Sequence, residues 1–120
     1  GSKAAIDDPA IRQRLATSIV DLELMRMNCL REFSKAIKGE KPGPESSLMK
    51  LYWSHVAQDM ADMAMEVLGP ETLLMQGDPD TIARGRFPMS FMQSRAFTIY
   101  SGTSEIQRNI IAERVLGLPK

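Results

Sequence analysis

Residues 7–39 read DDPAIRQRLATSIVDLELMRMNCLREFSKAIKG, one long helical pattern that decides the fold class. Asp8 can cap a helix N-terminus, and Pro9 suits the first helical position, where its missing N–H costs nothing. Gly39 ends the pattern. Apolar residues recur at spacings of three, four and seven, which predicts one inward-facing stripe on this helix. That stripe consists of Ile11, Leu15, Ile19, Leu22, Cys29 and Phe33.

Three more helices follow in the pattern. The second is expected to begin near Pro44 or Glu45 and to end at Gly69-Pro70. After a long loop over residues 71–86 with one short turn, a third helix is expected over residues 88–99. The last starts at a capping box, Ser104-x-x-Gln107, and stops at Gly117. Four amphipathic helices and no strand pattern predict an all-α, antiparallel four-helix bundle. The inward residues of the second and last helices are expected to be Leu48, Tyr52, Val56, Met63 and Val67, and Ile106, Ile110, Ile111 and Val115.

Composition restricts the classes of partner. The 120 residues suffice for one domain, and fifteen basic side chains balance fifteen acidic ones. A chain without net charge is not drawn to nucleic acid or to an anionic membrane, so neither is expected as a partner. The single cysteine, Cys29, is expected to be a buried, reduced thiol of a cytoplasmic protein. Gly1 and Ser2 are interpreted as the remnant of a cleaved expression tag.

One face of the second helix carries possible metal ligands, namely His55, Asp59, Asp62 and Glu66. Bundle metal sites combine Glu and His from facing helices, and this chain has a single His, so a solvated polar face is expected and no metal site. Neither a Ser-His-Asp grouping nor a glycine-rich phosphate loop can be argued from the sequence.

Residues 100–108 read YSGTSEIQR and form the segment of the sequence that most suggests a ligand site. Gly102 is placed in a tight turn just ahead of a capped helix, whose first N–H groups are unpaired. Such a helix start can bind a phosphate or the ribose-phosphate end of a nucleotide. Thr103 and Ser104 can either cap the helix or contact such a ligand.

This nine-residue segment closely resembles the C-terminal signature of the acyl-CoA dehydrogenases, and NIIAERVLGLPK continues it as in bacterial members. The segments PAIRQRLATSIVDLELMRMNCLREF and ESSLMKLYWSHVAQDMADMAMEVLG are similar to the two preceding helices of that family. The resemblance implies that residues 3–120 form the family's C-terminal helical domain, without the N-terminal helical and middle β-domains.

The resemblance also implies a reaction for the whole parent protein. A carboxylate removes the α-proton of an acyl-CoA thioester while the β-hydrogen leaves as hydride to FAD, and electrons pass to an electron-transferring flavoprotein. The 120-residue chain alone is expected to be inactive and not to hold FAD, because the absent domains supply the other half of each contact. Its implied role is subunit association and FAD contact, as part of a homo-oligomer or a mixed tetramer.

Site residues follow from the same resemblance. Gly102, Thr103 and Glu105 match positions that touch FAD near its diphosphate and adenosine half, and Arg108 matches a structural ion-pair partner. Glu66 and Gly69 match a turn that reaches the FAD of a neighbouring subunit. That turn departs from the family pattern, since Glu66 replaces a glutamine and Pro70 a second glycine. A carboxylate repels a diphosphate, so this contact is in question.

Ser101 occupies the position where many members carry the catalytic glutamate. A hydroxyl is far too weak a base to replace a carboxylate with a pKa near 4. The base is therefore expected on an earlier helix of the parent, which we favour, or on a different subunit of a mixed tetramer.

Two other hypotheses remain. The chain can be a non-catalytic helical assembly module, including a subunit without a base, or a small helical acyl-CoA carrier. The carrier hypothesis lacks an obvious Lys/Arg cluster for the CoA phosphates. Exposed apolar surface around Trp53, Met60 or Phe91 is expected to cause self-association.

Overall fold

The computed structural model describes residues 4–119, so the proposed tag remnant, Gly1 and Ser2, lies outside it. Over that range the chain is helical throughout and has no strand, which confirms the all-α class with four α-helices. The elements are η1 (Ala5–Asp7), α1 (Pro9–Ile37), α2 (Ser46–Leu68), η2 (Gly69–Leu73), η3 (Ile82–Gly85), α3 (Arg86–Phe97), α4 (Ser104–Ile110) and η4 (Ile111–Val115).

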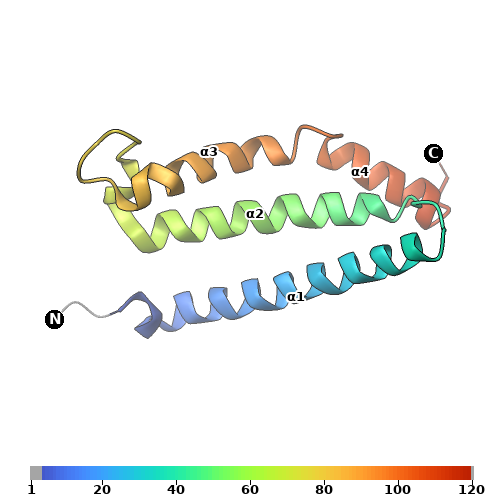
Figure 1. Ribbon diagram of the computed structural model, residues 1–120, viewed down its shortest axis with the longest axis horizontal. Coiled ribbons are helices and arrows are strands. Elements are labelled where there is room, and N and C mark those ends of the chain that lie inside the picture. The colour runs from blue at the N-terminus through green and yellow to red at the C-terminus, as the bar shows by residue number, and fades with distance from the viewer. Residues whose placement is uncertain (1–3, 120) are drawn as a thin grey trace.

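Helix α2 is the centre of the arrangement (Figure 1). α1 runs antiparallel along one side of it, and α3 followed by α4 occupies the other side in succession. The C-terminal end of α1 therefore lies at the same end of the molecule as α4 (Figure 1). The molecule is elongated, with extents of 55 × 30 × 28 Å.

Small side chains let α2 and α3 approach closely. Ser54 of α2 and Ser94 of α3 are fully buried, and each hydroxyl donates to a backbone carbonyl of its own helix. Gln58 Nε2 crosses from α2 to donate to the Ser94 carbonyl oxygen at 3.1 Å. Val56 and Met63 are the buried apolar residues of α2. By contrast Leu48 and Val67, both expected inside, are 39% and 36% exposed, and each borders an open pocket between α2 and the segment of α1 or η1 opposite.

The inward face of α1 is polar, contrary to the sequence-based expectation. Asp21 accepts a hydrogen bond from the Tyr52 hydroxyl of α2, and Arg14 forms an ion pair with Glu66. Ile19, Leu22 and Phe33 of the predicted stripe are exposed, and so is Cys29, which was expected to be buried. Ile11 and Leu15 of the predicted stripe are half-buried. The half-buried positions of α1 are Ile11, Arg14, Leu15, Ser18, Asp21, Met25, Asn28, Glu32 and Lys35, and all but Leu15 follow alternating spacings of three and four.

Helix boundaries agree closely with the predicted ones. Asp8 caps α1 by accepting from the Ala10 amide at 2.8 Å, with Pro9 at the first helical position. Gly69, at φ 69°, ends α2. α3 begins at Arg86, two residues earlier than predicted, and the expected loop contains η3 and much of η2.

The start of α4 differs by one residue from the predicted capping box. Thr103 is the N-cap, and its side-chain oxygen accepts from the Ile106 amide at 3.3 Å. Gln107 instead reaches back across the preceding turn. Ile106 and Val115 are exposed rather than inward, whereas Ile110 and Ile111 are half-buried. The last turn, η4, is π-helical and widens the helix before Gly117 ends it.

Candidate functional site

A tight turn between α3 and α4 is held by one side chain. Ser101 and Gly102 have φ values of 59° and 89°, two left-handed residues in succession. Gln107 Nε2 donates to the Ser101 carbonyl oxygen at 3.0 Å. A Cβ added at residue 102 would lie 2.6 Å from that same Nε2. The turn therefore favours glycine at position 102 for its backbone conformation, and a larger residue there would have to displace the Gln107 side chain.

A row of packed aromatic rings connects this turn to α2. Trp53 of α2 packs on Phe97 at 4.6 Å between ring centroids, and Phe97 meets the Tyr100 ring edge-on at 5.7 Å. The Ser104 amide donates to the Thr98 carbonyl oxygen at 3.0 Å, which closes the turn. The position of the start of α4 is thus fixed against α2.

A pocket of about 400 Å³ opens where α2, the end of α3 and the start of α4 meet. We call it the α4 pocket. Thr103 and Glu105, which the family resemblance assigned to FAD, both line this pocket. His55 and Gln58 of α2 also line it, and the sequence analysis did not assign them to FAD. Its lining residues are His55, Gln58, Thr98, Ile99, Thr103, Ser104, Glu105 and Arg108.

Three shielded polar atoms near this pocket have no hydrogen-bond partner among residues 4–119: His55 Nε2, Ser104 Oγ and Lys50 Nζ. Ser104 is only 5% exposed. A buried polar atom without a partner costs free energy, so each of these atoms gains by binding a group from outside the chain. All three can donate a hydrogen bond.

Glu105 places a carboxylate at the rim of the α4 pocket. Hydrogen bonds from its own backbone amide and from the Thr103 side chain lower the pKa of this exposed group, and the charges of Arg108 and Lys50 lower it further. Arg108 Nη1 lies 3.6 Å from Glu105 Oε1. Glu105 is therefore ionised at neutral pH, and Arg108 offsets its charge.

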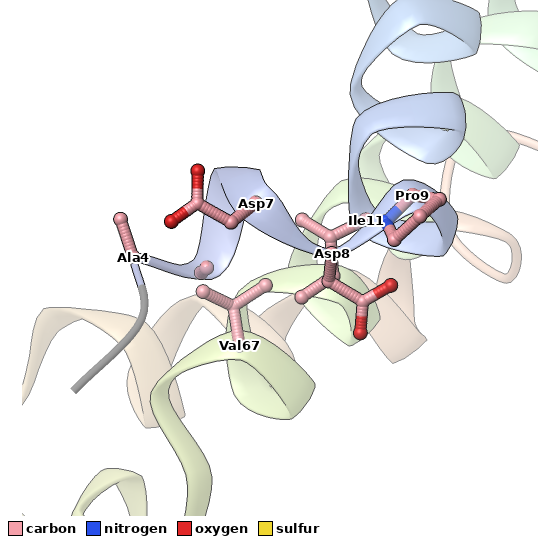
Figure 2. A pocket seen from close by; sticks show the side chains of 7 residues that line it. Ala4, Asp7, Asp8, Pro9, Ile11 and Val67 are labelled. Carbon is pink, nitrogen blue, oxygen red and sulfur yellow. The ribbon is translucent and has the colours of Figure 1, made fainter.

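A larger hollow, of about 590 Å³, lies at the other end of α2, against the start of α1. Figure 2 shows Asp7, Asp8 and Pro9 around it, with Val67 of α2 facing them. None of the described residues that line it is basic. Two carboxylates and no cation disfavour an anionic ligand there.

Comparison with known proteins identifies the family of this chain. The family described as "Acyl-CoA dehydrogenase, C-terminal domain" matches residues 1–116. The chain is 41% identical to acyl-CoA dehydrogenase IpdE1 of Mycobacterium tuberculosis over 98% of its length, and 42% identical to IpdE1 of Mycolicibacterium smegmatis over 97%. The chain belongs to the acyl-CoA dehydrogenase family. It spans 29% and 27% of those two relatives, and it corresponds to their C-terminal domain.

Solved structures share the fold. The ChsE4-ChsE5 complex from Mycobacterium tuberculosis superposes with a TM-score of 0.83 over the whole chain, at 30% identity and 31% of that chain. The Tcur3481-Tcur3483 steroid ACAD gives a TM-score of 0.86 over 97% of this chain and 30% of that one, at 22% identity. Each of these structures is named for two components.

The residues that the resemblance assigned to FAD do not all come together in this chain. Gly102 lies in the turn beside the α4 pocket, and Thr103 and Glu105 line it. Glu66 and Gly69 lie at the far end of α2, more than ten residues from His55, or roughly 16 Å of helix. Glu66 pairs there with Arg14, and the neighbouring hollow carries Asp7 and Asp8.

The acidic face of α2 is divided between separate ion pairs. Asp62 pairs with Arg95 of α3, whereas Glu66 pairs with Arg14 of α1. Within residues 4–119, no group of three or more His, Cys, Asp or Glu side chains could hold a metal ion. None of the helices described is both long and apolar enough to cross a bilayer.

Proposed function

We propose that this chain is the domain through which an FAD-dependent acyl-CoA dehydrogenase contacts its cofactor and associates its subunits. The parent protein would catalyse α,β-dehydrogenation of an acyl-CoA thioester and pass electrons to an electron-transferring flavoprotein in the cytoplasm. The observation that carries the cofactor contact is the α4 pocket, in which His55 Nε2 and Ser104 Oγ lack partners beside the family's signature turn.

The residues of the α4 pocket suit the adenosine half of FAD. His55 and Ser104 can donate to phosphate or ribose oxygens, and Lys50 and Arg108 supply positive charge nearby. The ionised Glu105 repels a phosphate but accepts hydrogen bonds from ribose hydroxyls. We therefore assign Glu105 to the ribose and the other donors to the phosphates. When bound, FAD supplies the redox chemistry, and these side chains hold and orient it.

The contact with FAD can be mapped on the chain itself. The isolated chain is not expected to hold FAD stably, since half of each contact is missing, so the test uses a large excess of FAD. Under that excess, amide NMR spectra should shift at residues 102–105 and at His55 through weak contact. Ser104→Ala should reduce these shifts, whereas Ser46→Ala, at an exposed serine of α2, should leave them unchanged. Shifts confined to the hollow at Asp7 and Asp8, or no shifts at all, would contradict the assignment.

The catalytic base is proposed to lie outside residues 1–120. Ser101 is exposed, and its hydroxyl cannot act as the base. A carboxylate on an earlier helix of the parent is our first assignment. The second assignment is that this chain belongs to a subunit without a base in a mixed tetramer. The solved structures with two named components support that second possibility. Flavin absorbance and turnover of the complete parent with a panel of CoA thioesters, alone and with candidate partner subunits, distinguish the two.

A further inference from the structure

Helix α1 carries a second regular face, directed away from α2. Its positions alternate at spacings of four and three, the repeat of a coiled-coil seam. All of them are exposed, and four are large and apolar: Ile19 (63%), Leu30 (48%), Phe33 (66%) and Ile37 (72%). We call this face the α1 seam. Its members are Arg12, Ala16, Ile19, Glu23, Arg26, Leu30, Phe33 and Ile37.

Two copies of the α1 seam that run antiparallel place complementary side chains opposite each other. When two copies run antiparallel with the two-fold axis between Glu23 and Arg26, Glu23 of each copy faces Arg26 of the other. Moving outward, Ile19 faces Leu30, and the small Ala16 faces the large Phe33. These three layers pair opposite charges, two apolar side chains, and a small side chain with a large one. At the ends, Ile37 packs on the aliphatic stem of Arg12.

We propose that α1 docks on α1 of a second copy of this chain, antiparallel and in this register. The proposal deepens the subunit-association part of the proposed function and rests on it. A parallel pair is disfavoured, because it would set Glu23 against Glu23 and Arg26 against Arg26. An unrelated partner is not needed, since a two-fold axis makes one surface its own complement.

The size of the α1 seam sets the strength of the dimer. Its eight positions a side are fewer than the roughly 20–30 residues a side of a standard stable interface. The 120-residue chain should therefore exchange between monomer and dimer, and the dimer fraction should rise with concentration.

Charge reversal tests the register. Glu23→Arg and Arg26→Glu each place like charges across the axis twice, so each should raise the dimer dissociation constant about tenfold, or ~1.4 kcal/mol. The double variant restores both pairs and should recover the original value. Arg31→Glu is the matched control, because Arg31 is exposed on α1, outside the α1 seam, and also borders a glutamate. Sedimentation velocity over a wide concentration range measures each constant.

Cysteine cross-linking tests the orientation independently of these constants. In a Cys29→Ser background, Ile19→Cys with Leu30→Cys should give a disulfide between residue 19 of one copy and residue 30 of the other. Each single variant should not cross-link, because like positions would be roughly 16 Å apart along the axis. A disulfide needs Cα atoms within about 7 Å. Bonds between like positions, found by peptide mass mapping, would overturn the antiparallel arrangement.

The outcomes separate this proposal from the proposed function. Self-association that persists unchanged in Glu23→Arg would overturn the α1 seam while leaving subunit association intact. A wild-type chain that stays monomeric at every concentration would overturn both. Because the α1 seam faces away from the α4 pocket, the FAD-dependent NMR shifts are expected to survive in either case.

Discussion

Gly102 is the residue on which the shape of the signature turn depends most directly. Gly102→Ala would strain a left-handed backbone by roughly 1–2 kcal/mol and also displace the Gln107 amide from the Ser101 carbonyl oxygen. Gly39→Ala is the matched control, since Gly39 has φ 77° and open space around it. In urea unfolding, the loss at residue 102 should exceed the loss at residue 39. Equal losses would show that Gln107 does not hold the turn.

Tyr52 couples the α1–α2 contact to pH. Its hydrogen bond to Asp21, then burial and the Asp21 charge, raise its pKa from 10.0 to about 12. The neutral phenol is favoured in the folded state, so its contribution is full below pH 10 and is lost as pH rises from 10 to 12.

Tyr52→Phe should therefore lower the free energy of unfolding by about 1 kcal/mol at pH 8, the value of one hydrogen bond. The difference from wild type should vanish above pH 12. Tyr100→Phe is the control, because its ring packs edge-on and the structure assigns it no such hydrogen bond. Denaturant unfolding across this range, with phenolate absorbance, measures both. A difference that does not change with pH would contradict the role of the Asp21 bond.

Residue-level predictions from sequence failed where two chemically similar candidates were adjacent. Thr103 and Ser104 both carry hydroxyls, and only the backbone conformation of residue 103 decides that Thr103 is the cap. The family resemblance predicted Thr103 and Glu105 as cofactor contacts, and the structure places both in the lining of the α4 pocket. His55 had been noted only as a possible ligand. Gln58 and Thr98 line the α4 pocket, and Lys50 lies near Glu105, because α2 packs against α4. The local sequence pattern carries no information on that packing.

At the scale of elements, α1 is the least firmly held helix. It has no buried residue, and its contact with α2 is largely polar, whereas α2 packs on both sides. Amide hydrogen exchange at low protein concentration should show weaker protection in the middle of α1 than in the middle of α2. Raising the concentration should increase protection in α1 first. Uniform protection of both helices would contradict this ranking.

Helix bounds were predictable because caps and glycines act locally, as at Asp8 and Gly69. The direction in which the α1 apolar stripe faces was not predictable. Periodicity shows that a face is apolar, but it does not show which molecule covers that face. Ile19 and Phe33 were assigned inward on the assumption that one chain supplies all partners, and the structure directs them outward.

At the scale of the whole molecule, little apolar surface is enclosed. Of the larger apolar side chains in residues 4–119, only Val56 and Met63 are buried. Trp53 and Met60, two of the residues expected to drive self-association, are each 36% exposed, whereas Phe91 is half-buried beneath Arg95. A chain with so small a core is therefore expected to gain part of its stability from association.

The thermal midpoint should therefore rise with protein concentration, because association stabilises the folded state by mass action. Glu23→Arg should flatten this dependence without changing the midpoint at high dilution by more than the loss of one surface ion pair, about 0.5 kcal/mol or less. Calorimetry at several concentrations checks this. A midpoint independent of concentration in wild type would contradict it.

The widened turn η4 sets the direction in which residues 116–119 leave the helix. In η4 the Leu116 amide reaches back five residues to the Ile111 carbonyl oxygen, one more than in an α-helix. Deleting a single residue between 111 and 115 would allow ordinary α-helical winding and would swing the departing chain by about 100°. Leu116 and Leu118 would then project in a new direction, so the aim of the tail is set by that one additional residue.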